Sequence, residues 1–598
     1  MEKKPSILHK IHLCCIGFRI LFKTSALYTI LIVFLNITSG IVAPLNAFAY
    51  QYLLDDIVKM LQAEKWSMTG FHFFMVLAIL SIISFTLNGV IDFIKQIFSD
   101  KLDLYITETV LKKTILLPMQ TFDNAEIYNH INMAVTRTSS SCLNLLEAIS
   151  EIIYSVVKGI AFLYIILNFS WPVAVVSMMS MIPLLNLSVA INKYWYQIYF
   201  QRIEKNRLIQ YLKMLLIKNS FIKEIKLFNV GEFIIDYIKE CFSNFIQEDM
   251  KRRKEFLYKK TIVQFLDDLV TIGLKIWLVV LSIMRSCTLG NIVLYINSLD
   301  DLKLSYNQLI RQFSMLQNSI QYLESLDIVE QEKEDSTRSG IDFDKDFREI
   351  EFRNVSFKYP GCDQYVLKDI SVKFERGKTF FIVGLNGSGK TTLIKLLLRL
   401  YKPVQGEILI DGVNIHSINL SQYYANIGAI FQDFIEYPFD VYKNVAIRMD
   451  KQSPNRFDEV LDCVELRDFV NGLPQQEKTL LLRDWTGGID LSQGQWQKLA
   501  IARCIFGNSC ISILDEPFSA VDAESEYTII SKLRRSMGNS LIIYITHRFS
   551  SISNEDVVVV LKNGSIVEIG THEELIENKN IYYRLFNSQK FKNGIEKI

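Results

Sequence analysis

Net charge is almost absent from this chain of 598 residues, because 65 lysines and arginines stand against 64 aspartates and glutamates. The nine cysteines are scattered, without any Cys-x-x-Cys pair, and no internal repeat or low-complexity tract is present. The first feature leaves no global electrostatic footprint for nucleic acid. The second argues against a disulfide framework and against a structural zinc site. Any sign of function must therefore lie in local motifs.

Hydrophobic residues make up half of the chain, and the mean hydropathy is +0.19. A chain of this length exceeds a single core, so at least two domains are expected. Six apolar stretches in residues 1–328 each approach the roughly 20 residues that cross hydrocarbon. They predict an all-α transmembrane domain rather than a soluble bundle, and the first is too long for a cleavable signal peptide. The stretches lie near 26–50, 71–92, 150–168, 172–191, 262–285 and 289–310.

A glycine-rich loop lies between an apolar run at 379–383 and a helix-like stretch at 392–398. It spans Gly384–Thr391 and follows the full Gly-x4-Gly-Lys-Thr phosphate-binding pattern. Glycines let backbone N–H groups approach a phosphate closely, and the N-terminus of the next helix adds partial positive charge. In this setting we expect Lys390 to reach the β- and γ-phosphates of ATP and Thr391 to bind Mg²⁺.

Further polar residues follow apolar, strand-like runs downstream of the loop. One run ends in Asp515 and Glu516, which places two carboxylates at the sheet edge where ligands bind in α/β proteins. Asp515 is suited to hold Mg²⁺, and Glu516 to polarise the water that attacks the γ-phosphate. Gln432 and His547 also follow such runs. Taken alone, His547 would more often be a structural histidine.

With Leu491-Ser-Gln-Gly-Gln495, these motifs in this order resemble the ATPase domain of ABC transporters over residues 349–586. The resemblance implies an α/β P-loop fold that hydrolyses ATP. It also implies catalytic roles for Glu516, His547 and Gln432. The segment Leu491–Gln495 corresponds to the family's signature motif, whose commonest form is Leu-Ser-Gly-Gly-Gln. Gln493 replaces the first glycine of that form, but this position varies within the family.

The same resemblance implies ATP and Mg²⁺ as cofactors. Tyr359 would stack on the adenine, Ser492 and Gly494 would contact the γ-phosphate held by the opposite subunit, and Asp522 would lie in a loop crossing the dimer interface. The implied Mg²⁺ site comprises Thr391, Gln432 and Asp515. The implied nucleotide-binding residues are Tyr359, Gly384, Asn386, Gly387, Ser388, Gly389, Lys390, Thr391, Thr392, Ser492, Gly494, Gln495 and Asp522.

The placement of positive charge predicts the orientation in the membrane. The connection 192–261 is crowded with lysine and arginine, including Lys251–Lys254. Residues 168–172 carry no charge, and only Arg285 lies between the fifth and sixth stretches. By the positive-inside rule both termini and the ATPase domain are cytosolic. Topology thus explains the basic runs, and we expect no nucleic-acid partner.

Six spans followed by an ATPase domain resemble one half of an ABC exporter. We expect a transmembrane domain at 1–328, a linker at 329–345 and a nucleotide-binding domain at 346–598. In that family two cytosolic segments dock on the nucleotide-binding domains, and residues 123–129 and 221–228 stand at the matching positions. The resemblance also implies a dimer, formed with a second copy or with a related half-transporter.

Charges within the predicted spans are costly unless they face a cavity or pair with one another. Several of them share helical faces in the third, fifth and sixth spans. They could form structural pairs between helices, or line a polar pathway for a zwitterionic or peptide-like cargo, and both explanations stay open. The pathway candidates are Lys158, Asp268, Lys275, Asp300, Lys303, Asn307 and Arg311.

One branch of the family fits best, the exporters of lantibiotics and related modified peptides of the bacterial inner membrane. Residues 431–438, 493–498 and 223–228 carry this resemblance. Because the first span begins within about 30 residues of Met1, we expect no leader-cleaving peptidase domain in this chain. A separate leader peptidase and modifying enzymes would then be its partners.

Two alternatives remain on sequence grounds. A lipid or multidrug exporter would share the whole architecture. An ATP-gated membrane sensor or channel regulator would share the domains but would not need turnover, and the filled catalytic positions disfavour it.

Overall fold

The computed structural model describes residues 7–63, 68–335, 340–448 and 454–592. Two compact units make up the chain. The first comprises Met1–Ile115 and Glu126–Glu332, and the second comprises Leu116–Ala125 and Lys333–Ile598. The short segment 116–125, expected within the transmembrane domain, thus packs with the second unit. Residues 336–339 of the expected linker lie outside the described residues.

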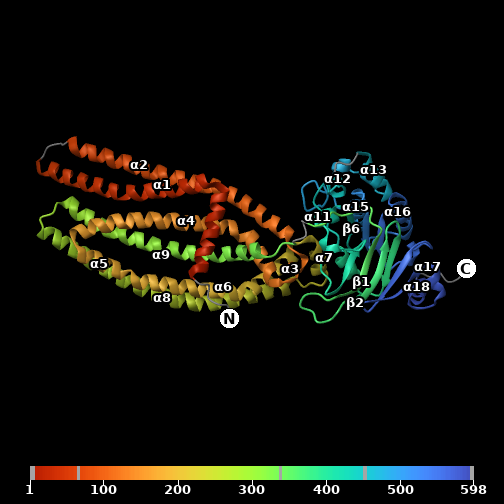
Figure 1. Ribbon diagram of the computed structural model, residues 1–598. Coiled ribbons are helices and arrows are strands. Elements are labelled where there is room, and N and C mark those ends of the chain that lie inside the picture. Colours follow the sequence, from red (N-terminus) through yellow and green to blue (C-terminus); the bar gives the residue numbers. More distant parts are fainter. Residues whose placement is uncertain (1–6, 64–67, 336–339, 449–453, 593–598) are drawn as a thin grey trace. The chain divides into compact units, whose positions relative to one another are not determined.

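The first unit consists of long helices (Figure 1). The backbone leaves the helical conformation at Ser25 (φ −166°, ψ 104°) within the first of them. Pro183 stands in the first turn of another helix, where its missing N–H costs nothing, and it separates that helix from the one before. The helices are α1 (Ile7–Ala63), α2 (Met68–Leu116), α4 (Ala125–Phe169), α5 (Trp171–Ser180), α6 (Ile182–Ile217), α7 (Asn219–Leu227), α8 (Gly231–Met284) and α9 (Leu289–Gln331).

Four helical segments among the described residues are long and apolar enough to cross a bilayer. They carry large apolar side chains on their outer surface, such as Phe85 and Trp171, which are 81% and 68% exposed. The remaining two predicted spans lie within α8 and α9, whose charged residues keep them out of this group. The four segments are His12–Ala63, Met68–Leu116, Thr138–Phe169 and Trp171–Trp195.

The second unit contains two β-sheets surrounded by shorter helices (Figure 1). An antiparallel sheet has the order β2-β1-β4-β5, and a mainly parallel sheet has the order β10-β9-β3-β8-β7-β6. The strands are β1 (Glu349–Phe357), β2 (Leu367–Glu375), β3 (Thr379–Gly384), β4 (Gln405–Ile410), β5 (Val413–Asn414), β6 (Ile427–Ile430), β7 (Ile511–Asp515), β8 (Leu541–Ile545), β9 (Val557–Lys562) and β10 (Ser565–Thr571).

Short helices complete this unit. The order of long apolar helices followed by an α/β domain confirms the predicted fold class. The helices are α3 (Met119–Asp123), α10 (Lys390–Leu397), α11 (Leu420–Ala425), α12 (Val441–Val445), α13 (Pro454–Cys463), α14 (Arg467–Asn471), α15 (Gln493–Phe506), α16 (Ala523–Ser536), α17 (His572–Glu577) and α18 (Ile581–Lys592).

The central strands of the larger sheet are buried along their whole length in β7 and β8. Their β-branched and apolar residues form continuous runs, as strands covered on both faces do. Strands β6, β7, β8 and β3 pair in parallel. Their carboxyl ends therefore meet at one edge of the sheet.

Candidate functional sites

The parallel sheet gathers the predicted catalytic motifs at one edge. The phosphate loop follows β3, the two carboxylates end β7, and His547 follows β8. Asp515 pairs with Ile545 in the β7–β8 ladder, which brings the carboxylates beside the histidine segment. Gln432 is exposed in the turn after β6, next to β7 in the sheet. Segments more than a hundred residues apart thus meet at the place where α/β sheets bind ligands.

The phosphate loop needs its glycines for two physical reasons. Gly387 and Gly389 have φ angles of +77° and +103°, which L side chains rarely adopt. At Gly384 a Cβ atom would lie 2.4 Å from the Leu561 carbonyl oxygen. Gly389 also stands at the N-cap of α10, so the free N–H groups of the first helical turn border the loop. The backbone is suited to cradle phosphate oxygens.

Lys390 folds back over this loop. Its Nζ donates to the carbonyl oxygens of Gly384 at 2.9 Å and Leu385 at 3.2 Å. Burial lowers the pKa of Lys390, while the carboxylates of Glu516 and Asp515 act in the opposite direction. The ammonium group is therefore held at the loop by weak carbonyl contacts that phosphate oxygens could replace.

Asp515 and two hydroxyl groups form an oxygen donor set that suits Mg²⁺. Burial raises the pKa of Asp515, and a hydrogen bond from the Thr391 side chain partly opposes this shift. The Oδ2 atom of Asp515 and the Oγ atom of Ser388 are buried without a hydrogen-bond partner among the described residues. Buried polar atoms normally have partners, and carboxylate and hydroxyl oxygens suit Mg²⁺. The residues present thus fit the metal that the loop motif implies.

Glu516 and His547 form a polar pair at the same edge. The Nε2 atom of His547 lies 2.8 Å from Oε1 of Glu516. The backbone N–H of Glu516 donates to the Ile545 carbonyl at 3.0 Å, and its φ angle is +48°. Both side chains are partly exposed. A carboxylate fixed in this way can accept a hydrogen bond from an attacking water.

Tyr359 lies beside the phosphate-loop helix. Its hydroxyl is 3.1 Å from Oγ1 of Thr392. Its ring packs edge-on against Tyr401 and Phe357, with centroid distances of 5.3 and 5.1 Å. The aromatic candidate for adenine stacking is thus fixed by neighbours on two sides.

A second group of predicted residues gathers at the starts of α15 and α16. Ser492 caps α15 in a reciprocal capping box with Gln495. Asp522 caps α16 by accepting the Ser525 N–H at 2.8 Å, which lowers the pKa of Asp522. A Cβ atom at Gly494 would lie 2.9 Å from the Ala520 carbonyl oxygen. The signature segment and the loop before α16 therefore touch one another.

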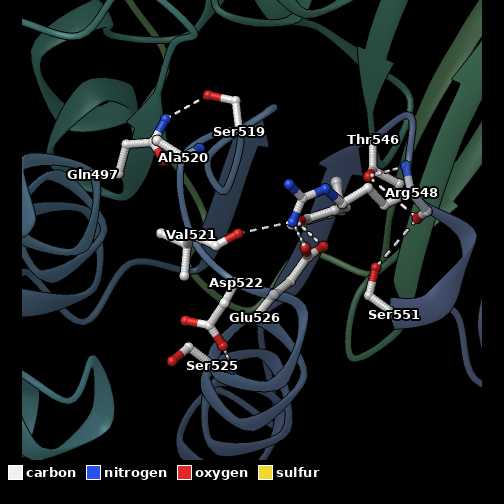
Figure 2. A network of polar contacts seen from close by, with 11 residues as sticks. Gln497, Ser519, Ala520, Val521, Asp522, Ser525, Glu526, Thr546, Arg548 and Ser551 are labelled. Atoms are coloured by element: carbon white, nitrogen blue, oxygen red, sulfur yellow. Dashed lines mark hydrogen bonds and ion pairs between the residues drawn. The ribbon is translucent and has the colours of Figure 1, made fainter. Parts of the chain in front are cut away.

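Sequence reasoning missed the side chains that connect these two groups (Figure 2). The Nη1 atom of Arg548 donates to the Val521 carbonyl and to Oε2 of Glu526, both at 2.9 Å. The Oε1 atom of Gln497 accepts from the Ala520 N–H at 2.8 Å. The adjacency of Arg548 to His547 was the available signal, but its partners are set only by the fold.

The membrane-side candidates are largely paired within the first unit. Ion pairs of 2.7 Å join Lys158 with Asp301 and Lys275 with Asp300. Lys303 lies 2.7 Å from both Asp268 and Asp267. Sequence reasoning identified neither Asp267 nor Asp301.

Two further candidates lie along α9. Asn307 lines a cavity of about 20 Å³ together with Lys303 and Asp267. Arg311 is exposed. The candidates thus share polar surroundings, although most of their charges are already balanced.

Comparison with known proteins defines the class. Residues 367–519 match the family model described as ABC transporter. A solved structure of a bacterial Atm1-family ABC exporter with ATP bound has a TM-score of 0.79 and 21% identity, covering 94% of this chain and 98% of the other. The chain is an ABC transporter ATP-binding domain fused to a transmembrane region, with the fold of an ABC exporter.

Two relatives resemble the chain over nearly its whole length. The subtilin transport ATP-binding protein SpaT of Bacillus subtilis is 28% identical over 592 residues, which is 97% of this chain and 94% of that protein. The nisin transport ATP-binding protein NisT of Lactococcus lactis subsp. lactis is 26% identical over 594 residues, or 97% and 96%. The activity of the chain is ATP hydrolysis coupled to transport, and it is a membrane protein.

Proposed function

We propose that this chain exports a lantibiotic or a related modified peptide across the bacterial plasma membrane. The supporting observation is that similarity to the subtilin and nisin transport proteins extends over 97% of this chain. It therefore includes the helical unit, where cargo specificity would reside. We propose six spans, with α8 and α9 supplying the last two, and cytosolic termini. A separate leader peptidase and modifying enzymes would act on the same cargo.

ATP hydrolysis would follow from the gathered sheet edge. The phosphate loop and Lys390 would hold the β- and γ-phosphates, and Tyr359 would stack on adenine. Thr391, Asp515 and Gln432 would hold Mg²⁺, which neutralises developing charge on the phosphates. Glu516 would polarise the attacking water, with His547 orienting its carboxylate. The 2.8 Å contact between these two side chains supports that division of roles.

Two copies would be needed for a complete site. Ser492, Gly494 and Asp522 gather at the starts of α15 and α16. We propose that they complete the site of a second subunit, so that two ATP molecules lie between two nucleotide-binding domains. Because every catalytic position is filled, a homodimer would suffice.

In the transmembrane region, we propose that the charged face of α9 lines the cargo route. The Lys–Asp pairs keep both signs at this face without leaving an uncompensated charge, and so lower the cost of charge within a bilayer. Such a surface suits a zwitterionic peptide better than a hydrocarbon.

The decisive experiment is reconstitution of the purified protein into proteoliposomes. A lantibiotic precursor peptide should stimulate ATP hydrolysis and accumulate on the side opposite the ATPase domain, whereas Glu516→Gln liposomes should accumulate none. Stimulation by lipids or drugs but not by the peptide would favour the alternative exporter. An ion conductance that persists without hydrolysis would favour a sensor or channel regulator.

A further inference from the structure

A short loop joins the two ends of the catalytic machinery within one subunit. This bridging loop, Ser519–Asp522, follows the Asp515–Glu516 strand end and leads into α16. Two separate side chains hold it from opposite directions (Figure 2). Gln497 reaches it from α15, and Arg548 reaches it from the segment after β8.

The first anchor ties the loop to the signature helix. Gln497 is only 2% exposed, and its side-chain amide is used twice. Its Oε1 accepts the Ala520 N–H, and its Nε2 donates to the Ser519 hydroxyl. Ser492 caps this same helix. A shift of the signature helix would therefore move the bridging loop.

The second anchor ties the loop to the histidine segment. Arg548 directly follows His547, and its own N–H donates to the Thr546 hydroxyl at 2.8 Å. One guanidinium nitrogen binds the Val521 carbonyl and the Glu526 carboxylate together. A displacement of His547 would therefore pull on the same loop from its other side.

Glu526 makes the second anchor rigid. Its side chain is only 2% exposed, and its other oxygen accepts the Tyr544 hydroxyl at 3.2 Å. A buried carboxylate that accepts hydrogen bonds from two donors fixes the guanidinium in one orientation. The Val521 carbonyl is thus held by a group that cannot easily rotate away.

We propose that Arg548 is a positioning residue for ATP hydrolysis, which sets the bridging loop relative to Glu516 and His547. Together with Gln497, Arg548 links two groups of residues through the bridging loop. Glu516 and His547 would act on the nucleotide bound by the same subunit, and the signature segment would contact the nucleotide bound by the partner subunit. This inference rests on the proposed ATPase dimer. Arg548 acts through the loop and His547 and touches no nucleotide itself.

Arg534 provides a matched control. It also pairs with a buried carboxylate, Asp556, which is 4% exposed, and it also donates to a backbone carbonyl, that of Ser551. The structure shows no contact between Arg534 and the bridging loop within the described ranges. Arg534→Gln and Arg548→Gln therefore break equivalent ion pairs, but only the second releases the loop.

The test compares these two variants with the full-length protein in detergent or proteoliposomes. Both should melt at lower temperature, because each leaves a buried carboxylate unpaired. Arg548→Gln should also lower kcat on the order of 10- to 100-fold with KM for ATP changed less than about twofold, as expected when catalytic groups are misplaced after binding. Arg534→Gln should keep at least about half of the wild-type kcat.

Hydrogen exchange gives a readout that needs no turnover. The Ala520 to Asp522 amides should exchange faster in Arg548→Gln than in Arg534→Gln, because local opening governs exchange. Equal exchange, wild-type kcat in Arg548→Gln, or kcat losses that merely follow the melting temperature in both variants would each overturn the inference. Failure of the proposed function would look different, since the wild type would then show no cargo-stimulated hydrolysis.

Discussion

The Tyr401 hydroxyl donates a hydrogen bond of 2.7 Å to the Asp123 carboxylate. Tyr401 is 3% exposed, and its ring also packs edge-on against Tyr359, the candidate for adenine stacking. Burial, together with Asp123, raises the pKa of Tyr401, so the hydroxyl remains a donor at neutral pH. The buried side chain of Tyr401 therefore connects helix α3 to the proposed nucleotide site.

Tyr401→Phe should weaken this connection while leaving the ring in place. Loss of a hydrogen bond to a charged group should lower the free energy of unfolding of the ATPase unit by about 2 kcal/mol. The stimulation of ATP hydrolysis by cargo should decrease by a larger factor than the affinity for ATP. Melting temperature, ATP binding and the ratio of stimulated to basal hydrolysis are the measurements. Tyr424→Phe is the control, since it removes only a hydroxyl contact to the Leu398 carbonyl. Identical behaviour of the two variants would contradict a special role for Asp123.

Glu516→Gln should bind ATP but turn it over on the order of 100 times more slowly or worse, because an amide cannot act as the base for water. Single-turnover assays with radiolabelled ATP would separate binding from hydrolysis. Glu524→Gln, an exposed acid in the first turn of α16, should be neutral. Hydrolysis at the wild-type rate in Glu516→Gln would show that another group activates the water.

Ser492→Arg should block hydrolysis although Ser492 lies outside its own phosphate loop. In a mixed dimer with Lys390→Ala, both lesions would fall in one shared site and leave the other intact, so activity should exceed that of either mutant homodimer. Thr571→Arg is the control, because Thr571 forms the same kind of capping box at α17. Independent hydrolysis by monomeric subunits would exclude the shared site.

Neutralising both members of the Lys275–Asp300 pair separates a cargo pathway from a structural pair. The double variant Lys275→Gln/Asp300→Asn leaves no unpaired charge, so melting temperature and basal hydrolysis should be preserved while peptide stimulation falls. The control is Lys239→Gln/Asp236→Asn, which removes an exposed pair of 2.9 Å on α8. Full peptide stimulation in the first double variant would remove this pair from the cargo route.

His416 predicts a pH dependence of stability in the ATPase unit. Burial lowers the pKa of His416 from 6.5 to about 4, helped by Arg399 and Lys402, and its Nε2 is buried without a partner among the described residues. Since the unfolded chain takes up the proton first, stability is complete above pH 6.5 and falls as the pH decreases towards 4.

The loss should reach about 2 kcal/mol in chemical denaturation of the wild type at a series of pH values. His416→Asn should show a flatter profile over that range. An unchanged slope in the variant would mean that other groups cause the dependence.

The order of the domains and the position of the catalytic edge could be read from the sequence, because both depend on local patterns. Apolar length predicts helices that can cross a bilayer, and each catalytic motif directly follows its own strand. The parallel order β3-β8-β7-β6 then brings Lys390, Asp515, Glu516 and His547 together. These four residues can be identified from the sequence around each of them, without knowing which distant residues they contact.

The missed residues depend on such partners. Asp301 in α9 and Asp267 in α8 can be recognised as partners only in the folded structure, where Asp301 pairs with Lys158 and Asp267 pairs with Lys303. Likewise, nothing in the sequence near Arg548 points to the Val521 carbonyl as its acceptor. A side chain whose role is to connect distant segments carries little signal in its own surroundings.

The backbone of Glu516 has a consequence for how variants should be ranked. With φ at +48°, it occupies a region that glycine and asparagine tolerate more readily than glutamate, and such conformations cost on the order of 1–3 kcal/mol. The carboxylate is thus kept at the expense of folding stability. Replacements that relieve this strain can raise the melting temperature while abolishing ATP hydrolysis. At this position, thermal stability is therefore a misleading measure of whether a variant is functional.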